Sequence, residues 1–242
     1  PPRGALRRFV GPGLLSAALV VVLGASGVHG LTLGALAVIV FAAAAQLAEF
    51  HRGARALGRA EGRPYPLALI ALFSANRRRY AGYLAHLGLA LALAGVTASS
   101  VYRTESDHTV SRGETFTVPG YLLRYDGAAL SRHPDKLVVA AAVSILPPKA
   151  LEAAPSRPAA AVPAIATLYP SERLYPQQRT PIPPPAVRST WRGDLYLVLL
   201  AVGPDGSVVL KAITNPLVPW IWTGGLLMAL AGLISIWPGR RG

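Results

Sequence analysis

The sequence contains no cysteine among its 242 residues. This absence excludes disulfide bonds, zinc and iron–sulfur sites built from cysteine, and a thiol nucleophile. Charged residues are also scarce, at 14%, whereas about a quarter of the residues in an ordinary soluble domain are charged. The glycine-rich phosphate loop and the H-E-x-x-H and G-x-S-x-G motifs are all absent. The composition therefore excludes an ordinary soluble domain.

Long apolar runs are what the sequence has instead, with 52% apolar residues and a mean hydropathy of +0.40. A hydrocarbon core about 30 Å thick requires about 20 apolar residues in a helix. The sequence predicts four such spans, at residues 10–26, 31–50, 80–101 and 217–237. The short turn 27–30 makes the first two spans a helical hairpin, and Pro12 is expected in the first turn of its helix, where proline is tolerated. In the last span, Gly224, Gly225 and Gly232 are expected to allow close helix packing.

Basic residues outnumber acidic ones by 24 to 11 and are unevenly distributed. Twelve of them lie before the first span, between the second and third spans, and after the fourth. The positive-inside rule assigns these three segments to the cytoplasm. The charge is therefore mainly an orientation signal, and we expect no nucleic-acid partner. The short apolar stretch 66–73 within the basic loop 52–79 is expected to lie at the membrane interface.

The segment between the third and fourth spans is strand-like. Short runs rich in Val, Thr and Leu occur at 114–118, 121–125, 136–146, 194–202 and 207–214. The turn Gly203-Pro204-Asp205-Gly206 predicts that the last two runs form a hairpin, with Leu195, Leu197, Leu199, Val208 and Leu210 in the core. We therefore expect a small antiparallel β-barrel or sandwich outside the cytoplasm. The proline-rich stretches 147–163 and 181–185 are expected to be loops or edges.

Together these patterns predict a membrane protein built as an α-helical transmembrane bundle with an extracytoplasmic β-rich domain. Residues 1–101 hold three spans and the basic loop, residues 102–215 hold the β-rich domain, and residues 216–242 hold the fourth span and a cytoplasmic tail.

His86 is the one histidine deep inside a predicted span. Ionisable residues in the membrane are costly and face a bundle interior or a cavity, so each is a candidate functional residue. An imidazole there can ligate a haem or another metal centre, relay protons, or hydrogen-bond a neighbouring helix. The residues that share its helical face are Arg79, Gly82, Tyr83, Leu89, Ala90 and Leu93. Gly82 and Ala90 leave room for a flat group, and Arg79 could meet an anionic one, so the layout suits an axial haem ligand, but the residues alone leave all three alternatives open.

The other histidines suggest no site. His51 lies at the end of a span, where an interfacial role is expected, and His108 and His133 lie in polar segments with no partner at metal-ligand spacing. His29 lies in the short outer turn, where it could approach a ligand held outside the membrane.

Several strings taken together resemble the C-terminal third of the CcmF-type haem lyases of System I cytochrome c maturation. The strings are NRRRYAGYLAHLGLALALAG (76–95), SSVYRTE (99–105), YPSERLYPQQ (169–178), DLYLVL (194–199) and NPLVPWIWTGGLLMALAGL (215–233). No single string is specific to this family, but the whole set of strings in this order is.

The resemblance implies a multi-pass protein of the inner membrane with a periplasmic β-rich domain. It implies partners as well: a haem chaperone, apocytochrome c, and other cytochrome c maturation subunits. The implied activity is attachment of haem to the CXXCH cysteines of apocytochrome c through thioether bonds. Family members also hold a haem b between two transmembrane histidines, and His86 matches the second of these in the string YAGYLAHLG. Arg79, Gly82, Tyr83 and Leu89 are then expected near this haem b.

The family's tryptophan-rich haem-handling segment, its two periplasmic histidines and its first transmembrane ligand are not found in this sequence. We expect them in the N-terminal haem-handling part of the same enzyme, so that this chain is a cropped domain or one subunit of a split enzyme. An alternative is a non-catalytic membrane anchor whose β-rich domain docks partners. A small transporter is disfavoured because no inverted repeat is evident.

The predicted topology has a direct test. With twelve basic residues holding the other loops inside, a protease site inserted at Ala159 should be cut from the periplasmic face of sealed membrane vesicles. Cleavage only from the cytoplasmic face would refute the predicted arrangement.

Overall fold

The computed structural model describes residues 3–147, 162–177 and 180–237. The chain forms two compact units, one of Pro1–Val101 with Leu217–Gly242 and one of Tyr102–Pro216. Most of the loop predicted at 147–163, including Ala159, lies outside the described residues.

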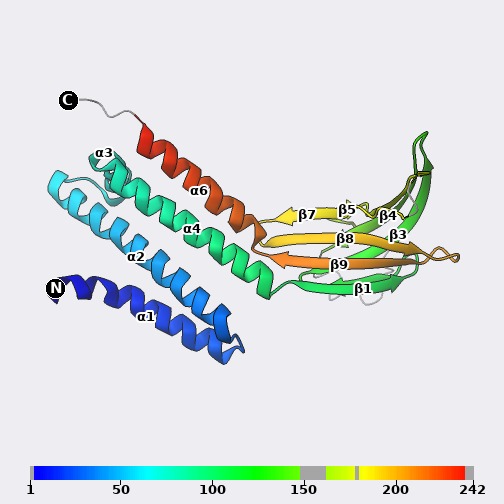
Figure 1. Ribbon diagram of the computed structural model, residues 1–242, viewed down its shortest axis with the longest axis horizontal. Helices are drawn as coiled ribbons and strands as arrows, with labels where there is room; N and C mark the ends of the chain where they lie inside the picture. Colours follow the sequence, from blue (N-terminus) through cyan, green and yellow to red (C-terminus); the bar gives the residue numbers. More distant parts are fainter. Residues whose placement is uncertain (1–2, 148–161, 178–179, 238–242) are drawn as a thin grey trace. The chain divides into compact units, whose positions relative to one another are not determined.

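The first unit is helical throughout its described part. Its helices are α1 (Arg3–Ala25), α2 (Gly30–Glu61), α3 (Tyr65–Ala75), α4 (Arg77–Val101) and α6 (Val218–Ile236). Helices α1, α2, α4 and α6 are long and apolar enough to cross a membrane. Figure 1 shows α2 between α1 and α4, with α6 along the other side of α4. Many of their large apolar side chains are exposed, which suits a lipid environment rather than water.

Helices α1 and α2 extend furthest beyond the predicted spans. Helix α1 begins at Arg3, so Pro12 lies inside the helix and the prediction that it occupies the first turn is wrong. Helix α2 continues eleven residues past the predicted end at residue 50, to Glu61, and Gly62 ends it in the left-handed conformation with φ of 65°. This extension carries much of the predicted basic loop on a helix.

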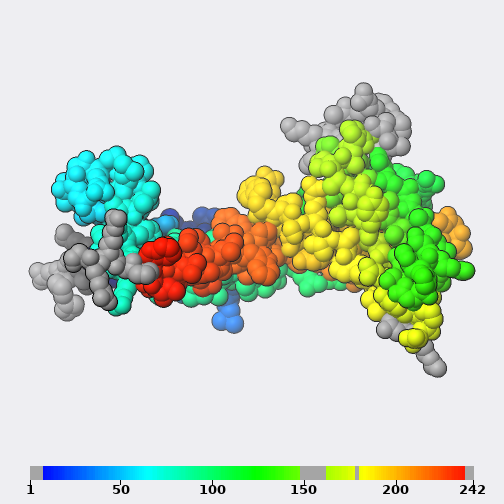
Figure 2. All heavy atoms as spheres, turned by 90° about the horizontal axis from the view of Figure 1, so that it is seen from above, coloured from blue at the N-terminus to red at the C-terminus, as the bar shows by residue number. Residues whose placement is uncertain are grey.

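Helix α3 covers the short apolar stretch and folds back on the end of α2. Ala54 of α2 and Ala68 and Leu72 of α3 are buried in a small cluster with Phe50 and Tyr80. In the space-filling view these parts of α2 and α3 form one cyan group (Figure 2).

Glycines allow α4 and α6 to pack closely. A Cβ atom on Gly88 would lie 2.7 Å from the carbonyl oxygen of Gly224, and one on Gly95 would lie 2.8 Å from Cγ1 of Ile221. Only glycine permits backbones to approach this closely. The prediction for α6 is therefore right for Gly224 but wrong for Gly225 and Gly232, which have open space at the Cβ position.

The second unit consists of two antiparallel sheets (Figure 1). One has the strand order β1-β9-β8-β7, and the other has β2-β3-β4-β5 with β6 also paired to β4. The strands are β1 (Thr104–Val110), β2 (Thr115–Val118), β3 (Tyr121–Arg132), β4 (Leu137–Leu146), β5 (Ala166–Leu168), β6 (Ser171–Leu174), β7 (Ala186–Thr190), β8 (Gly193–Val202) and β9 (Val208–Pro216). Both sheets are open, so the barrel alternative is wrong.

One hydrophobic core lies between the two sheets. It combines residues of β8 and β9, such as Leu197 and Leu210, with residues of β3 and β4, such as Leu123 and Val143. The predicted hairpin is confirmed, because β8 and β9 pair antiparallel on either side of residues 203–207. All five apolar residues predicted for its core are fully buried, because alternate residues of a strand point to one face. Strands β1, β5, β6 and β7 were not predicted.

The core makes a prediction about stability. Leu197 is fully buried, and its replacement by alanine should lower the free energy of unfolding of the β unit by about 2–5 kcal/mol, because a cavity is left in the core. Leu130, which is 67% exposed, provides a control whose replacement should cost no more than about 0.5 kcal/mol. Pulse proteolysis of the full chain across a urea series measures both, and equal effects would contradict this assignment of the core.

Candidate functional site

His86 lies on the face of α4 that points away from α6. Gly88 and Gly95, which contact α6, follow His86 by two and nine residues. At about 100° per residue, both lie about 180–200° around the helix from His86. The imidazole is accordingly exposed on the surface of the helical unit.

One hydrogen bond determines which ring nitrogen of His86 carries the proton in the neutral imidazole. Nδ1 of His86 lies 2.7 Å from the carbonyl oxygen of Gly82, one turn earlier on the same helix. Since a carbonyl oxygen can only accept, Nδ1 carries the proton and donates it. In the neutral ring, Nε2 then presents its lone pair outward, and a bond of this kind is how metal-bound histidines are usually oriented.

The surface around His86 is open and apolar. A Cβ atom on Gly82 would meet no atom within 4 Å. Leu89 and Leu93 follow along the same face, each with 45% of its surface exposed, while Ala90 is buried. This face therefore has the flat, apolar character that an imidazole-ligated macrocycle requires.

Arg79 and Tyr83 are involved in a different set of contacts. Nε of Arg79 donates to the hydroxyl of Tyr83 at 3.0 Å, and its Nη2 lies 3.3 Å from Oε2 of Glu49 on α2. The ring of Tyr83 packs edge-on against Phe50, with 6.2 Å between ring centroids. Both side chains thus help to join α4 to α2, and Nη2 of Arg79 is already engaged by Glu49.

His51 and His108 have partners of their own and do not join this site. Nδ1 of His51 lies 3.2 Å from the hydroxyl of Tyr65, while Nε2 of His108 lies 2.9 Å from Oγ of Ser106. Within the described ranges, no group of three or more His, Asp or Glu side chains is placed to hold a metal ion. The open, apolar face around His86 fits a haem, to which it would offer one ligand and one side of a pocket.

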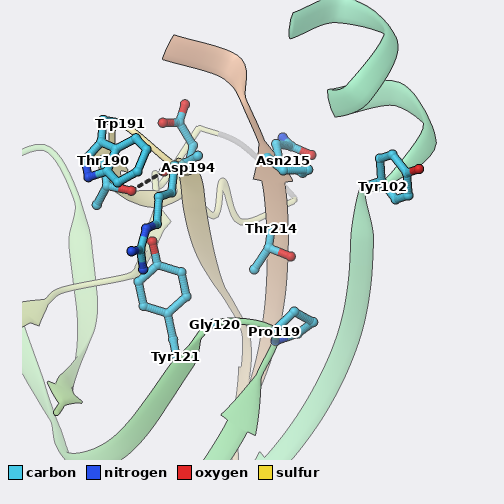
Figure 3. A pocket seen from close by; sticks show the side chains of 12 residues that line it. Tyr102, Pro119, Gly120, Tyr121, Thr190, Trp191, Asp194, Thr214 and Asn215 are labelled. Carbon is cyan, nitrogen blue, oxygen red and sulfur yellow. Dashed lines mark hydrogen bonds between the residues drawn. The ribbon is translucent and has the colours of Figure 1, made fainter. Parts of the chain in front are cut away.

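The β unit has a pocket that was not predicted from the sequence, with a volume of about 460 Å³ (Figure 3). Its lining comes from four separate segments: a residue two positions before β1, the β2–β3 turn, the β7–β8 turn and the end of β9. The lining residues are Tyr102, Pro119, Gly120, Tyr121, Thr190, Trp191, Arg192, Gly193, Asp194, Thr214, Asn215 and Pro216. No local pattern could have indicated it, because only the pairing of the strands brings these segments together.

Two buried acceptors in this pocket lack partners. Among the described residues, Oδ1 of Asp194 and Oδ1 of Asn215 accept no hydrogen bond, although Asp194 is only 7% exposed. The two residues are directly opposite each other on β8 and β9. Buried polar groups usually have partners, so the pocket is suited to a group that donates hydrogen bonds.

The other carboxylate oxygen of Asp194 accepts a hydrogen bond from the hydroxyl of Tyr196 at 3.1 Å. Burial raises the pKa of Tyr196 above its ordinary value of 10.0, and the hydrogen bond to Asp194 and its negative charge raise it further. The phenol therefore stays protonated, and stays a donor, at higher pH than an exposed tyrosine.

This pair makes a prediction about titration. Replacing Asp194 with Asn removes the negative charge, so the pKa of Tyr196 should fall, while its burial should keep the value above 10.0. Ultraviolet titration of the full chain measures the shift, and a Tyr196→Phe variant identifies which transition belongs to Tyr196. An unchanged pKa in the Asp194→Asn variant would show that the carboxylate does not act on this phenol.

Comparisons with known proteins give consistent relatives. No protein-family profile matches the chain. The chain is 31% identical over 162 residues to the cytochrome c-type biogenesis protein CcmF of Pseudomonas aeruginosa, which is 67% of this chain and 23% of the relative. It is 29% identical over 178 residues to the probable cytochrome c-type biogenesis protein NrfE of Escherichia coli, which is 72% of this chain and 29% of the relative. The chain thus spans about a quarter of the length of these relatives.

A solved structure has the same fold. The cytochrome c haem lyase CcmF matches 98% of this chain with a TM-score of 0.63 and 24% sequence identity, and the match covers 35% of that protein. The predicted resemblance to CcmF-type proteins is confirmed by these relatives. Together with the four long apolar helices, they identify a membrane protein with an appended unit of β-sheets.

Proposed function

Because this chain is similar over two thirds of its length to cytochrome c-type biogenesis proteins, we propose that it is part of an inner-membrane haem lyase. The reaction is the covalent attachment of haem, as substrate, to the CXXCH cysteines of apocytochrome c. Each bond is a thioether between a cysteine sulfur and a vinyl carbon of the haem. Because the reacting cysteines belong to apocytochrome c, we assign this chain the binding and positioning of the reactants.

The observation that carries the proposal is the orientation of His86. Its Nδ1 proton is held by the carbonyl of Gly82, which leaves Nε2 free on an open apolar face. We assign His86 as a residue that would ligate the iron of a haem b, with Gly82, Leu89 and Leu93 offering the apolar surface beside it. A haem b bound there would supply electrons that keep the iron of the substrate haem reduced. The second ligand comes from another part of the enzyme.

The β unit belongs on the periplasmic side in this proposal, because the twelve basic residues of the other segments hold the opposite side in the cytoplasm. There it can meet a haem chaperone, apocytochrome c and other maturation subunits.

A second candidate function is that of a membrane anchor whose β unit docks partner proteins. The pocket between the strand ends favours it, since Trp191 is 69% exposed at the rim and two acceptors below it lack partners among the described residues. Aromatic side chains beside a buried polar group are typical of protein-recognition surfaces. The two functions predict opposite results for haem content.

The test is to replace His86 with alanine in the assembled enzyme. The variant should insert and fold, because alanine is an excellent helix former, but it should lose haem b and mature little cytochrome c. His51→Ala is the matched control, since His51 lies on α2 and contacts Tyr65 instead of this face. The haem spectrum of the purified protein and the yield of cytochrome c in cells are the measurements.

Added imidazole should restore part of the haem in His86→Ala by occupying the vacated ligand position. Full haem content with an unchanged spectrum in His86→Ala would refute the ligand assignment. A well-folded enzyme that contains no haem b even with His86 present would support the anchor function instead.

A further inference from the structure

A second pocket lies in the helical unit, where α2 ends and α3 begins. Its volume is about 270 Å³, and it is lined by Ala54, Arg55, Gly58, Arg59, Arg63 and Tyr65. The small residues Ala54 and Gly58 form its floor. A Cβ atom on Gly58 would lie 3.0 Å from the carbonyl oxygen of Arg63, so the chain turns tightly over this position. Neither the haem-ligand site nor the pocket of the β unit uses any of these residues.

The pocket concentrates positive charge. Arg55 and Arg59 are one helical turn apart on α2, where like charges repel each other. Neither forms an ion pair with a carboxylate in the part of the chain described here, whereas Arg63 pairs with Glu61 at 2.7 Å. Two guanidinium groups that repel each other across one pocket are stabilised when a shared anion lies between them.

The dipoles of the two helix ends do not change the positive charge of the pocket. The C-terminus of α2 carries about half a negative charge and the N-terminus of α3 about half a positive one, so the two roughly cancel. The charge of the pocket is therefore set by its arginines. Planar guanidinium groups bind phosphate oxygens in pairs, which makes a phosphate the anion that fits best.

Helix α3, whose first residue Tyr65 lines the pocket, has an apolar outer face. On α3, Leu67 and Ile70 are 55% and 69% exposed, while Ala68 and Leu72 on the other side of the helix are buried against α2. This outer face lies about 140–200° around α3 from Tyr65, so the hydrocarbon of a ligand whose phosphate lies between Arg55 and Arg59 reaches it by passing round the first turn of α3. A soluble phosphate would use only the first of these two surfaces.

We propose that the groove formed by Arg55, Arg59, Arg63 and Tyr65, with the exposed face of α3, is a binding site for one anionic phospholipid. The headgroup phosphate is held by Arg55 and Arg59, and the acyl chains lie against Leu67 and Ile70. Such a lipid anchors α3 and the end of α2 at the membrane surface. The proposal does not depend on the haem-lyase function.

Native mass spectrometry of the purified full chain in detergent tests the site, with phosphatidylglycerol and phosphatidylcholine as probes. Phosphatidylglycerol should bind about tenfold more tightly, since each nearby arginine adds to the attraction for an anionic headgroup. The Arg55→Gln/Arg59→Gln variant should bind the two lipids equally. Arg8→Gln/Arg78→Gln is the matched control, because it removes the same charge from residues outside the pocket and should keep the preference.

Two further measurements complete the test. Arg55→Lys/Arg59→Lys keeps the charge but loses the planar groups, and its preference should lie between those of the wild-type chain and the glutamine variant. Soluble glycerol 3-phosphate, which has no acyl chains, should compete only weakly with phosphatidylglycerol. Equal binding of both lipids by the wild-type chain would overturn the proposal. An equal loss of the preference for phosphatidylglycerol in the Arg8→Gln/Arg78→Gln control would also overturn it. Competition by glycerol 3-phosphate at the same concentration as phosphatidylglycerol would do so as well.

Discussion

The close packing of α4 against α6 is the constraint on which the arrangement of the helical unit depends. Gly88 and Gly95 on α4, with Gly224 on α6, bring the two backbones to a distance that any side chain would prevent. Because this contact fixes the rotation of α4 about its own axis, it also decides which residues are turned outward. His86 is exposed because the glycines opposite it are buried. A larger residue at Gly88 would therefore disturb the histidine without touching it.

Unpaired acceptor atoms among the described residues mark where a ligand could bind. In a membrane, backbone and side-chain polar groups find partners within the protein because lipid offers none. Nδ1 of His86 follows this rule by bonding to the carbonyl of Gly82, and Arg79 follows it through Glu49 and Tyr83. Nε2 of His86, on the exposed face of α4, has no hydrogen-bond partner among the described residues. This nitrogen is accessible to a ligand, as are the two unpaired acceptors in the pocket of the β unit.

The basic residues at the end of α2 combine two physical roles. As a group they are expected to bias the orientation of the chain, because the positive-inside rule retains basic loops in the cytoplasm. Their individual positions decide which of them form ion pairs and which line the pocket. Arg52 pairs with Glu49 and Arg63 with Glu61, while Arg55 and Arg59 share one pocket beside an apolar helix face. The first role needs only the number of charges, and the second depends on the helix extending to Glu61.

By itself the sequence determined the features that depend on local pattern. Four apolar runs indicated four long helices, and alternation around residues 203–206 indicated the β8–β9 hairpin and its buried leucines, because length and period are properties of neighbouring residues. Only the tertiary structure decided that both sheets stay open, that Arg79 is joined to Glu49 thirty residues away, and that Gly225 and Gly232 face open space. The same holds for the pocket containing Asp194, whose lining comes from four segments. These features depend on which surfaces meet across long stretches of chain, and neither periodicity nor composition encodes that choice.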